Sequence, residues 1–216
     1  MSHPSLTHLE HRPWPLPTSP WRWRQSWRDL CFIHYRIAPE ALAGLLPEGL
    51  ALETFDGSAW LGVVPFSMEN MTKRGFPVVY PFRRFPELNL RTYVTVGGQP
   101  GVWFFSLDAQ CLPLVYGARL LFGLPYFQTK MHMQEANGSI EFSSRRRDGK
   151  AGFSARIRPD GKVFFSRKAT FEHWLTERYC LYSVTPRKRL VRLQVHHEAW
   201  PLEAAEADIA ENGLFA

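Results

Sequence analysis

Residues 118–127 read Ala-Arg-Leu-Leu-Phe-Gly-Leu-Pro-Tyr-Phe and place the end of a helix directly before the start of a strand. Residues 114–122 are rich in leucine and phenylalanine, which predicts a short buried helix. Gly123 follows it and is the residue type that most often ends a helix. A strand is expected from Tyr126 to residue 134. This passage positions one helix in a chain whose other segments are mostly strand-like.

The segments on either side of this passage predict a fold dominated by a sheet. Glycine-containing turns at residues 97–101, 137–138 and 148–149 predict hairpins, because glycine and asparagine adopt positive φ at little cost. Many antiparallel strands with few helices indicate an α+β, mainly β fold, a curled antiparallel sheet or closed β-barrel with peripheral helices. The other expected strands are residues 30–37, 58–68, 88–96, 102–109, 140–147, 152–158 and 190–196, and the other expected helices are 39–46, 171–179 and 202–212.

The length of 216 residues predicts a single domain, residues 1–216, with an irregular N-terminal arm at 1–20 that contains four prolines by Pro17. Three widely spaced cysteines predict reduced thiols and neither a disulfide framework nor a zinc site. No stretch approaches the roughly 20 apolar residues of a membrane span. The N-terminus also lacks the apolar core of a signal peptide, so we expect a cytoplasmic protein.

The net charge of +6 comes from 26 basic and 20 acidic residues. Such an excess can indicate a nucleic-acid partner. However, the basic runs at residues 145–147 and 187–189 adjoin turns and accompany no nucleic-acid motif. We therefore expect them to be solvated loop ends. Lysine is scarce, with only six in the chain, so any amine-based catalysis must use one of these six.

The four residues Glu87, Asn89, Arg91 and Tyr93 alternate along one expected strand. Because strand side chains point alternately to opposite faces, all four share one face. They could line a pocket, where a carboxylate, an amide and a guanidinium satisfy one another. They could also form the solvated face of a half-exposed strand. The sequence leaves both interpretations open and favours the pocket.

Further candidates lie around the expected helix. Asp108 precedes it, and a helix cap is the favoured role, because Asp accepts hydrogen bonds from the free N–H groups of a first turn. Arg119 lies on an otherwise apolar helix, so we expect a buried guanidinium paired with Glu87 or with a ligand carboxylate. His196 and His197 are adjacent, and strand geometry would point them to opposite faces. We therefore expect no metal site.

Several blocks together resemble the bacterial family called domain of unknown function 2071, or YqjF-like. The resemblance extends from about Trp27 to the C-terminus and is specific in combination. That family is similar to the acetoacetate decarboxylase fold, which implies a curled antiparallel barrel with peripheral helices and a central pocket. The blocks that carry the resemblance are residues 46–50, 55–60, 63–68, 87–94, 105–109, 124–126, 175–179 and 197–202.

The resemblance also bears on chemistry. In acetoacetate decarboxylases a lysine of lowered pKa forms an imine with the substrate. The matching positions here are Tyr126 for that lysine and Phe127 for its lysine neighbour, while Arg119 matches the arginine of the family and Glu87 a pocket carboxylate. A phenol cannot form an imine, so this route is excluded. Lys130 lies roughly 13 Å further along the strand and is no simple replacement.

We therefore expect an enzyme of unknown reaction, with lyase-, isomerase- or hydrolase-like acid–base chemistry on a small organic acid or carbonyl compound. Arg91 or Arg119 would hold the anion, Glu87 would move a proton and Tyr126 would donate to a developing oxyanion. Asn89 and Tyr93 would complete the ligand site. No cofactor, nucleic acid or membrane is expected, and a homo-oligomer is left open. The alternatives are a non-catalytic binding protein and a structural or interaction protein with an internal polar network.

Overall fold

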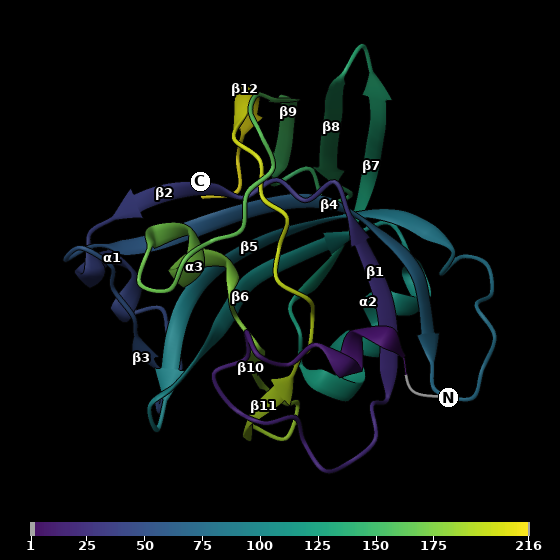
Figure 1. The fold of residues 1–216 in the computed structure, drawn as a ribbon. Coiled ribbons are helices and arrows are strands. Elements are labelled where there is room, and N and C mark those ends of the chain that lie inside the picture. The colour runs from purple at the N-terminus through teal and green to yellow at the C-terminus, as the bar shows by residue number, and fades with distance from the viewer. Residues whose placement is uncertain (1–2, 216) are drawn as a thin grey trace.

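The computed structural model describes residues 3–215 and is dominated by one twelve-stranded mixed sheet (Figure 1). The strand order along its main path is β1-β4-β5-β6-β7-β8-β9-β12, with β2 paired to β4, β3 to β5, and β10 to both β6 and β11. The strands are β1 Trp23–Arg28, β2 Ile33–Ile37, β3 Ala51–Leu52, β4 Ala59–Lys73, β5 Arg84–Val96, β6 Gln99–Ala109, β7 Tyr126–Ala136, β8 Ser139–Arg146, β9 Gly152–Pro159, β10 Cys180–Val184, β11 Leu190–Gln194 and β12 Ala205–Asn212. The helices are the 3-10 turn η1 Pro4–Thr7 and the α-helices α1 Pro39–Ala43, α2 Leu112–Phe122 and α3 Phe171–Thr176.

The mainly β, α+β class is confirmed, but the sheet is open and does not close into a barrel. Its path ends at β1 on one side and at β12 on the other. The strands β7, β8, β9 and β12 rise away from the curled part formed by β4, β5 and β6 (Figure 1). Two pairings are parallel, β6 with β7 and β6 with β10. A parallel neighbour needs a crossover connection, and α2 supplies the one between β6 and β7.

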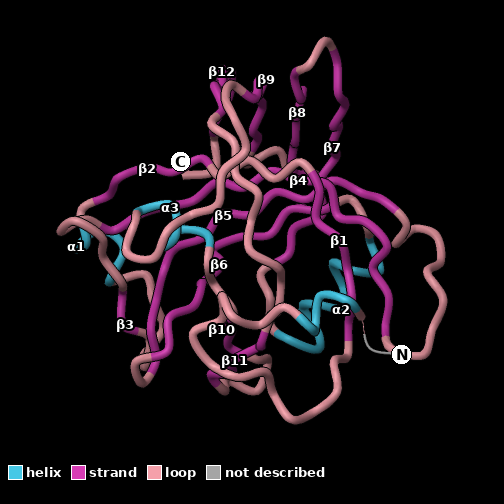
Figure 2. The backbone as a smooth tube through the Cα atoms, in the orientation of Figure 1, coloured by secondary structure: helices cyan, strands magenta, loops and turns pink. Residues whose placement is uncertain are grey.

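The helices are short and lie at the periphery of the sheet (Figure 2). Helix α2 ends at Gly123, whose φ of 68° is the left-handed conformation expected of a glycine after a helix. The prediction of a buried helix is only half correct. Leu114, Val115 and Ala118 are buried, whereas Tyr116 and Leu120 are exposed. The helix therefore covers the sheet with one face only.

The glycine-containing turns form the hairpins that the sequence predicts. Gly97 and Gly98 have φ values of 56° and 77° and join β5 to β6. Asn137 and Gly138, with φ values of 51° and 71°, join β7 to β8. Positive φ at both central residues is the two-residue turn whose twist matches that of antiparallel strands.

Replacing Gly138 by Ala is expected to lower the free energy of unfolding by about 1 kcal/mol, because a left-handed conformation is unfavourable for a residue with a Cβ. A Cβ at this position would meet no atom within 4 Å, so the effect is one of backbone conformation alone. Gly44 is the matched control, since its φ is −70° and its surroundings are equally open. Gly44→Ala should be neutral or slightly stabilising in urea denaturation. Equal losses in the two variants would contradict this explanation.

The C-terminal segment differs from its prediction. Residues 202–212 were expected to form an amphipathic helix, but β12 pairs with β9 from Ala205 opposite Pro159 to Asn212 opposite Phe153. Without β12, the backbone N–H and C=O groups along that edge of β9 would have no partner. This long-range pairing overrides the weak helical preference of an Ala- and Glu-rich segment.

Strand β5 lies between two apolar clusters. This position determines what surrounds the row of polar side chains Glu87, Asn89, Arg91 and Tyr93. Leu88 and Leu90 face a cluster that includes Val63 and Phe153. The opposite face of β5, with Glu87, Asn89 and Tyr93, belongs to the cluster that includes Val64, Phe66, Leu107 and Tyr126. The solvated-face interpretation of the row is therefore wrong.

Candidate functional site

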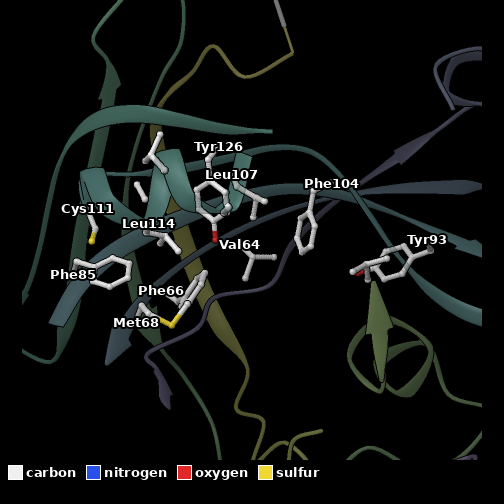
Figure 3. Close-up of a cluster of buried hydrophobic side chains, with 14 of the residues drawn as sticks. Val64, Phe66, Met68, Phe85, Tyr93, Phe104, Leu107, Cys111, Leu114 and Tyr126 are labelled. Atoms are coloured by element: carbon white, nitrogen blue, oxygen red, sulfur yellow. The ribbon is translucent and has the colours of Figure 1, made fainter. Parts of the chain in front are cut away.

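Glu87 and Tyr126 form a buried pair near the ends of three neighbouring strands. Glu87 lies opposite Ala109 in the β5–β6 ladder, and Tyr126 lies opposite Leu107 in the β6–β7 ladder. This order brings the phenol to the carboxyl group across β6. The Tyr126 hydroxyl lies 3.2 Å from each carboxyl oxygen of Glu87. Only 2% of Glu87 and 6% of Tyr126 are exposed, and Figure 3 shows the Tyr126 ring among Leu107, Leu114, Phe66 and Val64.

Burial changes the protonation of this pair. Removal from water raises the pKa of Glu87 to about 8, a rise that the hydrogen bond from Tyr126 opposes and the negative charge of Asp108 reinforces. The pKa of Tyr126 is raised well above its usual value by burial and by the adjacent Glu87 carboxylate. At pH 7 Glu87 is therefore mostly a neutral carboxylic acid. A carboxyl group whose pKa lies near neutral pH can both donate and accept a proton in a reaction.

Removing the hydroxyl of Tyr126 should raise the pKa of Glu87 above 8. The hydrogen bond from Tyr126 stabilises the carboxylate, so in Tyr126→Phe the ionised form loses its donor inside an apolar cluster. We expect a loss of about 1–3 kcal/mol in folding stability at pH 9, where the wild-type carboxyl is ionised. The pKa can be followed by the carboxyl carbon signal of Glu87 in an NMR titration. An unchanged or lower pKa in the variant would contradict the role given to the hydroxyl.

The other three residues of the row continue along the same face of β5. The Arg91 guanidinium donates from Nη2 to the Tyr93 hydroxyl at 3.3 Å and to the Leu175 carbonyl at 3.2 Å. The Tyr93 hydroxyl is also 2.6 Å from His34 Nε2. Among residues 3–215, however, the buried atoms Asn89 Oδ1 and Arg91 Nε have no hydrogen-bond partner. Buried polar atoms are nearly always paired, so these two atoms are exceptions, as are six others among the described residues.

Arg119 is not part of this site, and the expectation that it pairs with Glu87 is wrong. Its side chain is exposed on α2. The helix buries Leu114, Val115 and Ala118, and one further residue along a helix turns the side chain by about 100°. Arg119 consequently belongs to the outer face with Leu120.

Asp108 is not a helix cap, which corrects a second expectation. Cys111 occupies the cap position of α2. Asp108 is 1% exposed and accepts three hydrogen bonds of 2.8–3.1 Å from Nε and Nη2 of Arg146. Arg146 also stacks on the Phe127 ring, 3.9 Å from its centroid. The middle arginine of the run at 145–147 is therefore no solvated loop end but half of a buried ion pair.

The described residues can be searched for a metal-binding group and for a membrane-spanning helix. Within residues 3–215 no group of three or more His, Cys, Asp or Glu side chains is arranged to hold a metal ion. His196 and His197 instead contact backbone carbonyls, with His196 Nε2 2.7 Å from Ser5 O and His197 Nε2 3.2 Å from Arg178 O. None of the helices in that part of the chain has the length and apolar character to cross a bilayer.

The architecture is that of the acetoacetate decarboxylase-like proteins. A structure of the enduracididine biosynthesis enzyme MppR superposes with a TM-score of 0.68 at 18% identity, covering 90% of this chain and 78% of that one. Acetoacetate decarboxylase from Legionella pneumophila superposes with a TM-score of 0.62 at 16% identity, covering 94% and 80%. At these identities the likeness shows a shared fold.

The chain belongs to the family of uncharacterised conserved proteins called domain of unknown function 2071, whose model matches residues 24–216. The protein YqjF of Bacillus subtilis is 43% identical over 198 residues, which cover 91% of this chain and 81% of YqjF. The resemblance seen in the sequence blocks is thereby confirmed.

Proposed function

We propose that this protein binds a small organic acid or carbonyl compound beside β5 and transfers a proton on it with Glu87 and Tyr126, without an imine. The observation that carries the proposal is the buried Glu87–Tyr126 pair, followed on the same face by the unpartnered atoms Asn89 Oδ1 and Arg91 Nε. Asn89 Oδ1 offers an acceptor and Arg91 Nε a donor to a ligand on that face of β5.

The chemistry follows from the protonation of the pair. The ionised fraction of Glu87 would accept a proton from the carbon next to the ligand carbonyl, and the carbonyl oxygen would receive a hydrogen bond from Tyr126 as negative charge develops on it. The Glu87 carboxyl group would then exchange its proton with solvent and return a solvent-derived proton to the carbon, which completes the exchange. Asn89, Arg91 and Tyr93 would contact the ligand on the same face of β5, with Arg91 Nε donating a hydrogen bond to a ligand oxygen.

Two neighbours in the fold support carbonyl ligands. MppR has been solved in complex with pyruvate and with the condensation product of pyruvate and imidazole 4-carboxaldehyde. The acetoacetate decarboxylases act on a keto acid, as their name states. This chain has Tyr126 at the start of β7, where the resemblance places the amine of those decarboxylases, so the proposed chemistry uses acid and base groups only.

Exchange with solvent tests the proposal. In D2O, the protein should accelerate deuterium incorporation next to the carbonyl of pyruvate, 2-oxobutyrate or 4-oxopentanoate, and the rate should rise with pH through about 8 as Glu87 ionises. Glu87→Gln should lose about 100-fold or more of this rate. Glu203→Gln, at an exposed carboxylate, is the control. No acceleration with any of the three acids would refute the proposal.

Borohydride trapping tests the absence of an imine. Reduction by borohydride in the presence of pyruvate should add no mass to Lys130 or to any other lysine. A covalent adduct at any of them would show that an amine participates after all.

A structural role is the second candidate, and the tight burial of Glu87 and Tyr126 favours it. In that case Glu87→Gln and Tyr126→Phe would change folding stability and leave exchange and ligand binding at the level of buffer.

Mass spectrometry of the denatured, purified protein adds an independent measurement. A co-purified organic acid that is lost in Arg91→Met would support the ligand site.

A further inference from the structure

A cleft of about 450 Å³ opens where β7 leaves β6. Strand β6 ends at Ala109, whereas β7 continues to Ala136, so one edge of β7 beyond Gln128 is no longer covered by β6. The segment before β5, the start of β5, the two residues before α2, β7 and the residue after β8 surround this opening. The described residues that line it are Tyr80, Pro81, Arg84, Phe85, Gln110, Cys111, Thr129, Lys130, Met131 and Arg147.

The charge of the cleft is one-sided. Its lining contains the three cations Arg84, Lys130 and Arg147 and no carboxylate. Arg84 is partly balanced by Glu69 at 3.3 Å. Lys130 and Arg147, by contrast, have no carboxylate within 4.0 Å in the described part of the chain. Two cations without a carboxylate partner attract an anion to a concave surface. Arg147 Nε and Nη2 lie 2.9 and 3.0 Å from the Gln128 amide oxygen in its hydrogen-bonded orientation, so an anion would bind the Nη1 side of Arg147 and the Lys130 ammonium.

The inner wall of the cleft separates it from the acid–base pair. Phe85 and Cys111 form this wall, and each is at most 3% exposed. Phe85 precedes Glu87 by two residues on the same face of β5, a separation of about 7 Å along a strand. Cys111 lies close to Glu87. Burial is the main influence that raises the pKa of the Cys111 thiol, and the negative charge of the Glu87 carboxylate also raises it. Figure 3 shows Phe85 and Cys111 together at one end of the cluster that contains Tyr126.

We propose that the substrate of the Glu87–Tyr126 site binds in this cleft with its carboxylate on Lys130 and Arg147, and reaches the pair past the side chains of Phe85 and Cys111. The inference rests on the proposed function for the identity of the reacting pair and adds the class of substrate. A carboxylate between Lys130 and Arg147 places the next few carbons against Phe85 and Cys111, on the side of Glu87. The substrate is therefore a short, linear keto acid with its carboxylate at one end and its carbonyl group directed inward, and not a neutral ketone.

Charge reversal at the cleft tests this assignment. The double variant Lys130→Glu/Arg147→Glu is compared with Lys162→Glu/Lys168→Glu, which changes the net charge equally at exposed positions outside the cleft. Dissociation constants are measured by NMR titration for 4-oxopentanoate and for the neutral ketone 2-pentanone. We expect the acid to bind wild type and control equally and the cleft variant about tenfold more weakly or worse, as loss of charge-assisted hydrogen bonds predicts. The ketone should bind all three proteins equally weakly.

Several outcomes would overturn the inference. These are equal affinity for the acid in all three proteins, no measurable binding of the acid to wild type, and binding of inorganic phosphate at the cleft in preference to the acid. Because Lys130, Arg147 and both control lysines are exposed, all variants should retain the wild-type melting temperature within a few degrees.

Glu87→Gln separates this inference from the proposed function. The variant should keep the affinity of the cleft for 4-oxopentanoate while losing proton exchange. If wild type binds the acid through Lys130 and Arg147 but catalyses no exchange, the proposed function fails and the cleft assignment stands. If exchange occurs and is unaffected by charge reversal in the cleft, the cleft assignment fails and the proposed function stands.

Discussion

Glu87→Gln is expected to become more stable relative to the wild type as pH rises, by roughly 3 kcal/mol between pH 4.5 and pH 7. The carboxyl group has a pKa of about 8 in the folded protein and about 4.5 when unfolded. Between these values the folded state holds a proton that the unfolded state has lost. Wild-type stability therefore falls with rising pH, by about 1.4 kcal/mol per pH unit, and levels off above pH 8. A neutral amide at this position removes that dependence.

Urea denaturation of both proteins at intervals from pH 4.5 to pH 9 measures this difference. Glu203→Gln, at an exposed carboxylate, should follow the wild-type curve throughout. Parallel pH curves for Glu87→Gln and wild type would mean that Glu87 is ionised inside the folded protein at neutral pH. The carboxyl group could then act as a base but not as the neutral acid described above.

Arg146→Met is expected to destabilise the fold by about 3–5 kcal/mol, because it leaves the buried Asp108 carboxylate without its partner. The Arg146 guanidinium donates three hydrogen bonds to the Asp108 carboxylate and also stacks on the Phe127 ring. Burial already raises the pKa of Asp108, and Arg146 is the main influence that lowers it. The loss should therefore be greatest at neutral and alkaline pH and smaller in acid, where Asp108 takes up a proton.

A double-mutant cycle identifies the cause of this loss. Asp108→Asn combined with Arg146→Met removes both charges and should recover a large part of the stability lost in Arg146→Met. Arg145→Met is the neighbouring control, since Arg145 pairs with Glu211 at the surface and should cost about 1 kcal/mol or less. Equal destabilisation by Arg145→Met and Arg146→Met would show that the ion pair is not the reason.

The fold was predictable from sequence where the signals are local. The turns at Gly97-Gly98 and Asn137-Gly138 and the helix end at Gly123 depend on residues that tolerate positive φ, and all three form as predicted. β12 was missed because its conformation depends on pairing with β9 far away in the chain, which a local pattern cannot reveal. The open form of the sheet has the same origin, since closure depends on which distant edges meet.

The candidate site was predictable to a similar extent. Alternation alone placed Glu87, Asn89, Arg91 and Tyr93 on one face, and the structure places that face inside an apolar cluster. Arg119 was misplaced because α2 presents it outward. Apolar residues lie on both sides of this helix, so the sequence alone does not determine which side faces the sheet. The partner of Asp108 could not be found from sequence because Arg146 arrives from β8, and three adjacent arginines look alike until the register of that strand is known.

The ladder between β9 and β12 has a consequence for the order of folding. The β4–β5–β6 meander joins neighbours in the chain, so its contacts close short loops and can form early. Contact between Pro159 and Ala205, by contrast, spans 46 residues that include α3, β10 and β11. Closing such a loop is entropically slow, so β12 is placed among the last elements to assemble, and β9 remains a bare edge in the partly folded chain until it does.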